Sequence, residues 1–188
     1  IFVESTVEKD FLEWGVGDAE RIVYAPHWYD VVTLAFKKFN RWIAFDSWTG
    51  KIVWWPSSIR RSFANQIALY KQQARDHLGR APVHLGEMGI PMDIDEARAY
   101  RTEDFSVQER TVDRCMRAVE DNIMNVTIWN YTPDNNNTRG DQWNGEDFSI
   151  FSRDQQKDPA DPYSGGRALR ALVRPYPKAT AGRPTQLS

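Results

Sequence analysis

The sequence predicts an α/β fold with a parallel sheet and, within that class, the C-terminal half of a (β/α)₈ barrel. Four short segments are almost continuously apolar, as expected for strands of a parallel sheet covered on both faces: residues 1–4, 22–30, 82–90 and 125–131. Segments whose apolar residues have helical spacing separate the second, third and fourth of these strands. Because four strands are half the number that closes such a barrel, and because the first strand starts at once, we expect the chain to be part of a longer polypeptide.

Two long helices are predicted between the strands. In residues 59–80 the apolar side chains recur every three or four positions, and Pro82 follows the end of the pattern. Residues 107–124 show the same spacing. Ser106, with Glu109 three residues later, predicts a capping box at the start of this second helix.

The connecting segments differ in character. Residues 31–58 are a long aromatic-rich connection, and residues 134–147 are a polar loop rich in Asn, Asp and Gly. A last helix is predicted at 166–173, and the Pro- and Gly-containing residues 175–188 have the composition of an extended linker.

Composition excludes several functional classes. The net charge is −2 with acids and bases interspersed, which predicts no nucleic-acid partner. No apolar run approaches the roughly 18 residues of a transmembrane helix. The single cysteine, Cys115, falls in a helical pattern and is predicted to be a buried thiol, so no internal disulfide is possible. With three histidines in no cluster, we expect no metal, and we expect no cofactor. The lack of an internal disulfide fits a reducing compartment, and the compartment expected is the cytoplasm or the vacuole.

Glu87 is the main candidate for chemistry. It ends a short apolar run, lies between Gly86 and Gly89, and comes just before Pro91. Strands of a barrel enzyme present carboxylates to substrate in this way, and glycines leave room around them. The alternative is a strand-end glutamate that faces solvent.

Alternation along strands predicts which side chains meet. Residues two apart share a face, so His27 and Tyr29 point together and Trp28 points away. If the strand ends meet at one rim, His27, Tyr29, Glu87 and Trp129 converge on a single pocket. A carboxylate, its hydrogen-bonding partners and an aromatic face suit a sugar ring.

The same alternation argues against a metal pair at His84 and Glu87. An odd spacing on a regular strand sends the two side chains to opposite faces. We therefore expect Leu85 to share the face of Glu87, and His84 to pack under the helices.

At this point the sequence resembles glycoside hydrolase family 5, in the larger clan of retaining (β/α)₈ glycosidases. It looks closest to the branch of endoglycoceramidases, fungal glucosylceramidases and fungal sterylglucosidases. The resemblance covers nearly the whole chain and rests on four motifs: APHWYD at 25–30, LGEMGIP at 85–91, IWNYTPDN at 128–135 and GDQWNGEDFSIFS at 140–152.

The resemblance implies a domain division and residue roles. Residues 1–174 would be strands five to eight of the catalytic barrel, and 175–188 would lead into a C-terminal β-sandwich. Glu87, on the seventh strand, would be the nucleophile. His27 and Tyr29 on the sixth strand would position it and contact the sugar, and Trp129 on the eighth would lie under the glucose ring.

Further sugar ligands are expected in the polar loop. Asp134 and Asn135 directly follow the Trp129 strand and are candidates for binding hydroxyl groups. Trp143, in the same loop, is a third candidate.

One departure from the family pattern has a consequence for activity. The family's acid/base glutamate follows an Asn at the end of the fourth strand, but this chain contains no Asn-Glu pair. Glu4 ends the strand that corresponds to the fifth, one strand too late, so it is kept only as the alternative acid/base residue and as a candidate to line the pocket. We therefore expect the acid/base residue upstream of Ile1, and expect this chain to need an N-terminal half-barrel, from the same polypeptide or a second chain.

The resemblance predicts a retaining β-glucosidase whose substrate is a steryl β-glucoside or glucosylceramide. Alternatives are an endoglycoceramidase or endoglucanase of the same fold, and a non-catalytic carbohydrate- or lipid-binding module. The aromatic side chains of residues 31–58 either line a groove for the lipid part of the substrate or pack that segment onto the barrel. A lipid substrate also suggests transient contact with a membrane surface.

Overall fold

The described part of the computed structural model, residues 1–4, 15, 17–18, 20–176, 181–182 and 184–185, contains parallel strands in chain order. They are β1 (Phe2–Val3), β2 (Val23–Tyr24), β5 (His84–Met88) and β6 (Asn125–Ile128). Strand β1 pairs with β2 and β5 pairs with β6, both parallel. Parallel bridges at Tyr24–Val83 and His27–Glu87 join β2 to β5. The predicted parallel arrangement is confirmed, with strands shorter than the apolar runs.

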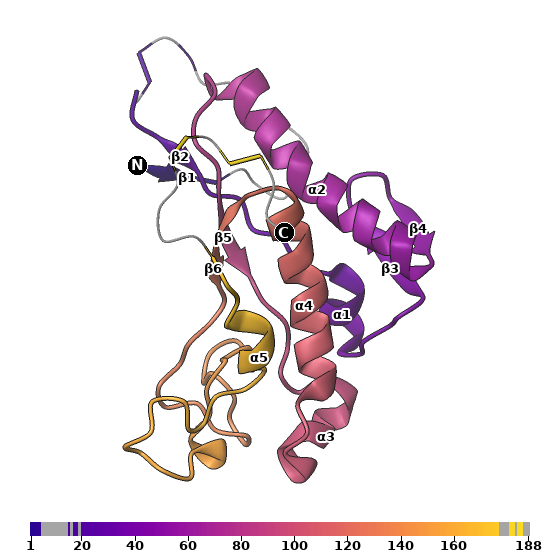
Figure 1. The fold of residues 1–188 in the computed structure, drawn as a ribbon, viewed down its shortest axis with the longest axis vertical. Coiled ribbons are helices and arrows are strands. Elements are labelled where there is room, and N and C mark those ends of the chain that lie inside the picture. The colour runs from indigo at the N-terminus through magenta and orange to yellow at the C-terminus, as the bar shows by residue number, and fades with distance from the viewer. Residues whose placement is uncertain (5–14, 16, 19, 177–180, 183, 186–188) are drawn as a thin grey trace.

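Two long helices cover one face of these strands (Figure 1). Helix α2 spans Pro56–His77 and helix α4 spans Ser106–Asp121. Their buried side chains form one core with Tyr24, Leu85 and Met88 of the strands. The expectation that both faces are covered is wrong for the described residues, because the opposite face borders an open hollow of about 300 Å³. A sheet curved toward a closed interior needs helices on its outer face alone.

The segment predicted as an irregular connection contains regular elements. It holds helix α1 (Val31–Phe36) and an antiparallel hairpin of β3 (Ile43–Asp46) and β4 (Lys51–Trp54). The turn is closed by the Asp46 side chain, whose Oδ1 accepts hydrogen bonds from the amides of Trp48 and Thr49 at 3.1 and 3.0 Å. Its Oδ2 accepts one from the Ser62 hydroxyl at 2.7 Å, which ties the hairpin to α2.

The helix boundaries differ from the prediction in ways that local chemistry explains. Helix α2 begins three residues early, at Pro56, because proline favours the first helical position. Helix α4 begins at Ser106 itself, so the predicted capping box is wrong. The Asp104 side chain instead accepts the Ser106 amide at 3.0 Å.

Short helices complete the chain. Helix α3 (Ile94–Thr102) was not predicted, a 3₁₀ turn spans Arg153–Gln155, and α5 (Leu169–Leu172) is shorter than the helix expected at 166–173. Much of the expected linker at 175–188 lies outside the described residues.

Two predictions from composition can be compared with the structure. Cys115 is buried on α4, as predicted, and burial raises the pKa of its thiol to about 12. Among the described residues, none of the helices combines the length and the apolar character required to cross a bilayer.

Candidate active site

A β-bulge at the end of β5 determines where Glu87 points. The register with β6 shifts between Leu85 and Met88, and both of these side chains are buried in the core beneath the helices. The intervening Glu87 lies on the other side of the strand, where only a fifth of its side chain is exposed. The extra residue of a bulge re-aims one side chain without removing its neighbours from the core.

Glu87 contacts both residues predicted to surround it. The Tyr29 hydroxyl donates to Glu87 Oε1, and His27 Nδ1 lies 3.2 Å from Oε2. Each carboxylate oxygen therefore has one polar partner from the neighbouring strand segment. The alternative of a solvent-facing glutamate is wrong.

Tyr29 is held in its protonated form. Burial, and then the hydrogen bond to Glu87 and its charge, raise the pKa of the Tyr29 hydroxyl far above its ordinary value. The charges of Glu146 and Glu4 act in the same direction. A tyrosine that keeps its proton at every physiological pH is a permanent donor to the carboxylate.

The segment that carries His27 and Tyr29 is anchored from behind. Trp28 points away, as predicted, and its indole donates to Gln66 of α2 at 3.2 Å. The buried Asp30 caps α1 and pairs with Arg114 of α4. These contacts hold the strand end against the helical layer.

The prediction for His84 is wrong. Its ring faces the open hollow, with Glu4, His27 and Gly86 in the same lining, and its Nε2 lies 2.7 Å from Thr127 Oγ1. Leu85, expected beside Glu87, is the residue buried under the helices. The alternation rule failed because the bulge interrupts it. No group of three or more potential ligands among the described residues could hold a metal ion.

Trp129 follows β6 and lies beside the loop that leaves Glu87. Its amide donates to the Met88 carbonyl at 2.9 Å. Gly89 is required here, because an added Cβ would overlap the Trp129 carbonyl oxygen. Phe148 lies edge-on to Tyr29, with ring centroids 6.0 Å apart. The Trp129 side chain is half-buried.

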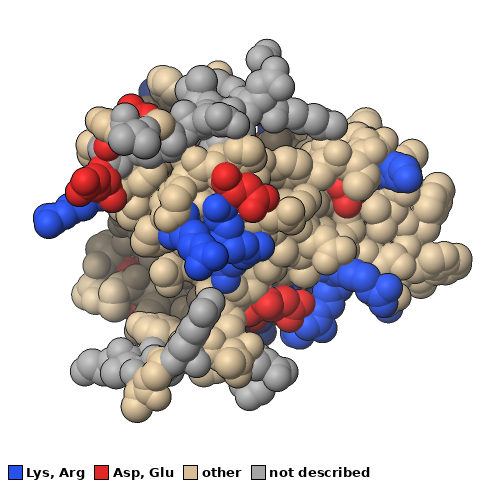
Figure 2. Space-filling model, turned by 90° about the horizontal axis from the view of Figure 1, so that it is seen from above, with Lys and Arg blue, Asp and Glu red and all other residues tan. Residues whose placement is uncertain are grey.

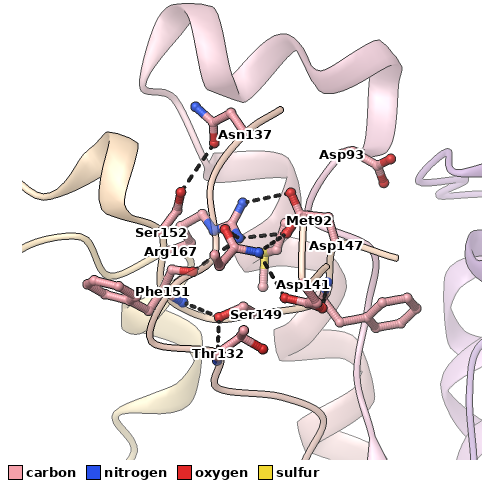
Figure 3. Close-up of polar contacts among 12 residues, drawn as sticks. Met92, Asp93, Thr132, Asn137, Asp141, Asp147, Ser149, Phe151, Ser152 and Arg167 are labelled. Carbon is pink, nitrogen blue, oxygen red and sulfur yellow. Dashed lines mark hydrogen bonds and ion pairs between the residues drawn. The ribbon is translucent and has the colours of Figure 1, made fainter. Parts of the chain in front are cut away.

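A buried polar cluster fixes the loop after Trp129 (Figure 3). Arg167, fully buried, pairs with Asp147 at 2.6 Å and donates to the Asn135 side chain at 2.7 Å. Asn135 in turn donates to Asp141 and Asp147 at 2.8 and 2.9 Å. The Asp147 carbonyl accepts the Met92 amide at 2.7 Å. The cluster therefore connects the loops that follow β5 and β6.

The predicted loop ligands divide into two kinds. Asn135 is fully buried and both ends of its amide are occupied within the cluster, an arrangement that supports the loop. Asp134 and Trp143 are exposed, and Asp134 accepts from Gln142 at 2.9 Å. Glu146, which sequence reasoning missed, is close enough to act on Tyr29 electrostatically. Its position in the GDQWNGEDFS motif was the available signal.

Glu4 also reaches the site. Its Oε1 lies 3.2 Å from His27 Nδ1, the atom that also contacts Glu87. Two carboxylates from different strands thus share one imidazole nitrogen.

We expect Tyr29→Phe to lower kcat/KM by roughly 10- to 100-fold, because a hydrogen bond to a charged group contributes about 1.5–3 kcal/mol. The measurement is hydrolysis of a fluorogenic β-glucoside, the activity that the resemblance predicts, by the longest polypeptide that contains this chain. Tyr163→Phe, at an exposed tyrosine, is the control. Ultraviolet titration should show the same number of tyrosines ionising below pH 10 in the wild type and in the variant, because Tyr29 stays protonated in that range. Unchanged kinetics would contradict the role of Tyr29.

Comparison with known proteins finds several that are similar to this chain. The chain is 38% identical over 184 residues to a glucosylceramidase of Cryptococcus neoformans var. grubii, a match that covers 90% of this chain and 25% of the relative. It is 34% identical over 147 residues to the ergosteryl-beta-glucosidase of Saccharomyces cerevisiae, covering 72% and 19%. The crystal structure of Cryptococcus neoformans sterylglucosidase 1 with tris superposes with a TM-score of 0.81 at 35% identity, covering 89% and 26%.

This chain is homologous to part of the fungal glucosylceramidases and sterylglucosidases. It spans about a quarter of the length of the curated relatives it matches. No protein-family profile matches the chain. The mixed α/β fold found here is that of the sterylglucosidase segment.

Proposed function

We propose that this chain is the nucleophile-bearing part of a retaining β-glucosidase that acts on a glycolipid, a steryl β-glucoside or glucosylceramide. The observation that carries the proposal is Glu87 at a strand end, with Tyr29 and His27 on its two oxygens. Homology to glucosylceramidases and an ergosteryl-beta-glucosidase supports the substrate class.

The contacts of Glu87 suit a nucleophile. In a retaining mechanism one carboxylate attacks the anomeric carbon and forms a glycosyl ester, while an acid protonates the leaving oxygen; water then hydrolyses the ester. Tyr29 donates to the carboxylate, so it stabilises the charged, attacking form. His27 orients the second oxygen from the same strand segment.

The proton donor is proposed to lie in the part of the polypeptide that the relatives contain and this chain lacks. A retaining enzyme needs its two carboxyl groups roughly 5–5.5 Å apart. Glu4 is the alternative within this chain, because it reaches His27 from the next strand. Family 5 places that residue on the fourth strand, and β1 would be the fifth.

The architecture proposed for the complete protein is a (β/α)₈ barrel, with residues 1–174 as its C-terminal half and 175–188 leading to a further domain. Four parallel strands in chain order, with the helices of the described residues on one face, support this interpretation. The open hollow on the other face would become the barrel interior.

Sugar contacts are proposed at the rim around Glu87. Trp129 would lie under the glucose ring, and Asp134, Trp143 and Glu146 would face its hydroxyl groups. Asn135 would act through the loop rather than by direct contact, because it is buried and fully hydrogen-bonded.

We expect the 188-residue chain alone to show no turnover of a fluorogenic β-glucoside, because it lacks the rest of the barrel. Adding a separately expressed N-terminal half, which supplies the acid/base residue, should restore hydrolysis. The same half added to a Glu87→Gln chain should not. Strong turnover by the isolated chain would refute the proposal and would direct attention to Glu4.

The substrate class is tested by comparing the hydrolysis rates of three candidate substrates. Hydrolysis of a steryl glucoside, glucosylceramide and cellotetraose by the full-length enzyme separates a glycolipid glucosidase from an endoglucanase. Preference for cellotetraose would overturn the glycolipid assignment but leave the role of Glu87 intact.

A further inference from the structure

The hairpin and the helix before it expose an unusual number of large apolar side chains. We call this the hairpin surface, formed by Leu34, Phe36, Trp42, Ile52, Trp54 and Trp55. Their exposed fractions run from 40% for Leu34 to 71% for Phe36. Soluble domains rarely expose apolar side chains in contiguous groups, and such a group commonly marks a contact site.

The exposure follows from the hairpin's two faces. Ala44, Asp46 and Val53 face inward toward α2, whereas the cross-strand pairs Ile43–Trp54 and Phe45–Ile52 form the outward face. Only part of the aromatic segment packs inward: Trp48 contacts Tyr70, and Phe39 lies under Arg114. The packing alternative raised for residues 31–58 therefore describes Trp48 and Phe39 but not the outward side chains.

A groove runs between the outward face and α1. Its volume is about 660 Å³, and its lining is apolar except for Lys38 and Asn40. The walls come from Val32, Phe36, Ile43 and Ile52, among others. The groove is large enough to accept acyl chains or bulky apolar groups.

Basic residues outnumber acidic ones in the segment that forms this surface, although the whole chain is slightly acidic. Residues 31–75 contain eight Lys and Arg and one acidic residue, Asp46, which is buried beneath the hairpin. Of these bases, Lys37 pairs with Asp93 and Arg60 with Asp121. Lys38 and Arg41 are exposed and make no ion pair within the described residues, and the Arg41 guanidinium lies 5.2 Å from the centroid of the Trp42 ring. Figure 2 shows the end of the molecule that carries the hairpin as mostly uncharged, with both basic and acidic side chains beside it.

The hairpin surface lies to the side of the candidate active site. The hairpin packs on α2, in the helical layer, and not on the strand ends that carry Glu87 (Figure 1). Helix α1 connects the two, because it starts two residues after Tyr29. A molecule held at this surface would therefore lie beside the site.

We propose that the hairpin surface docks on an anionic lipid membrane, with its aromatic side chains in the interface and its basic residues against the headgroups. Exposed Trp and Phe partition into the headgroup region, and each nearby Lys or Arg adds attraction to anionic lipid. Charge complementarity selects this partner: neither the apolar part of a single substrate molecule nor a covering protein segment requires an excess of unpaired cations. The inference extends the proposed function. Its test measures vesicle binding, which does not require hydrolysis of any substrate.

The test is sedimentation of the longest polypeptide that contains this chain with large unilamellar vesicles. Vesicles of phosphatidylcholine with 30% phosphatidylserine, a proportion on the order of that in anionic leaflets, are compared with phosphatidylcholine alone. We expect binding to the anionic vesicles that weakens as salt is raised. Phe36→Ala with Trp54→Ala should lower the partition coefficient about tenfold or more. Lys38→Gln with Arg41→Gln should lower it about tenfold on anionic vesicles only.

Matched controls separate this surface from general effects. Tyr163→Ala and Arg98→Gln change an exposed aromatic and an exposed basic residue elsewhere and should leave binding unchanged. Glu87→Gln should also bind normally, so failure of the catalytic proposal is distinguishable. The inference would be overturned if the wild type did not bind the vesicles. It would also be overturned if neither the apolar nor the basic pair of substitutions weakened binding. A raised KM of these variants for a detergent-solubilised steryl glucoside with unchanged vesicle binding would overturn it too, and would indicate a groove for the lipid part of the substrate instead.

Discussion

Glu87→Gln in the full-length enzyme should reduce kcat by roughly 10⁴-fold or more, while substrate binding survives. An amide of the same shape cannot attack the anomeric carbon, and loss of a group that acts directly in the chemistry costs on this order. The measurement is the initial rate with a fluorogenic β-glucoside. Incubation of the wild type with an activated 2-deoxy-2-fluoro-glucoside, followed by peptide mass spectrometry, should place the sugar on Glu87.

The matched control for this substitution is Glu96→Gln, at an exposed glutamate on α3, which should retain full activity. A Glu87→Gln variant that keeps more than a few per cent of wild-type kcat would show that another group is the nucleophile. If neither protein turns over any glycoside but both bind glycolipid, the chain is a binding module of the same fold.

Arg167→Met should destabilise the protein by about 3–5 kcal/mol, the cost of leaving a buried carboxylate without its partner. Arg167 is fully buried, and its guanidinium holds Asp147, Asn135 and the Phe151 carbonyl. Thermal unfolding of the full-length protein, followed by near-ultraviolet circular dichroism, measures the loss. We also expect lower activity, because the cluster holds the loop after Trp129 against the loop after Glu87.

Two further variants show whether the loss comes from the ion pair. Arg98→Met removes an exposed arginine and should leave the unfolding temperature unchanged. Combining Arg167→Met with Asp147→Leu removes both charges and should recover part of the stability, since apolar replacements of a buried pair are often tolerated. A loss below 1 kcal/mol in the single variant would contradict a structural role for the cluster.

Alternation along strands was a good guide where the strand is regular. It correctly placed His27 and Tyr29 together and Trp28 in the core. On β5 the same rule put Leu85 beside Glu87 and His84 under the helices, and both expectations are wrong. A bulge adds one residue to one strand only, and its position depends on pairing with a neighbour that the local sequence does not contain.

Turn chemistry explains a second difference. The hairpin of β3 and β4 carries a usable local signal, since Asp46 and Gly50 flank a turn between two apolar runs. Whether such a pair of strands forms depends also on a surface to pack against, and here α2 provides it through Ser62. The aromatic richness of residues 31–58 alone did not separate inward from outward side chains.

The amino-acid sequence alone was enough to identify the parallel α/β class, the strand that ends at Glu87 and its two partners on the neighbouring strand. Those features depend on apolar runs, glycines and residue spacing over a few positions, which act locally. Only the tertiary structure decided that His84 faces the interior, that Asn135 is buried with Arg167, that Glu4 and Glu87 share one nitrogen of His27, and that Glu146 approaches the site. These depend on contacts between distant segments, because burial and ion pairing arise when separate elements pack together.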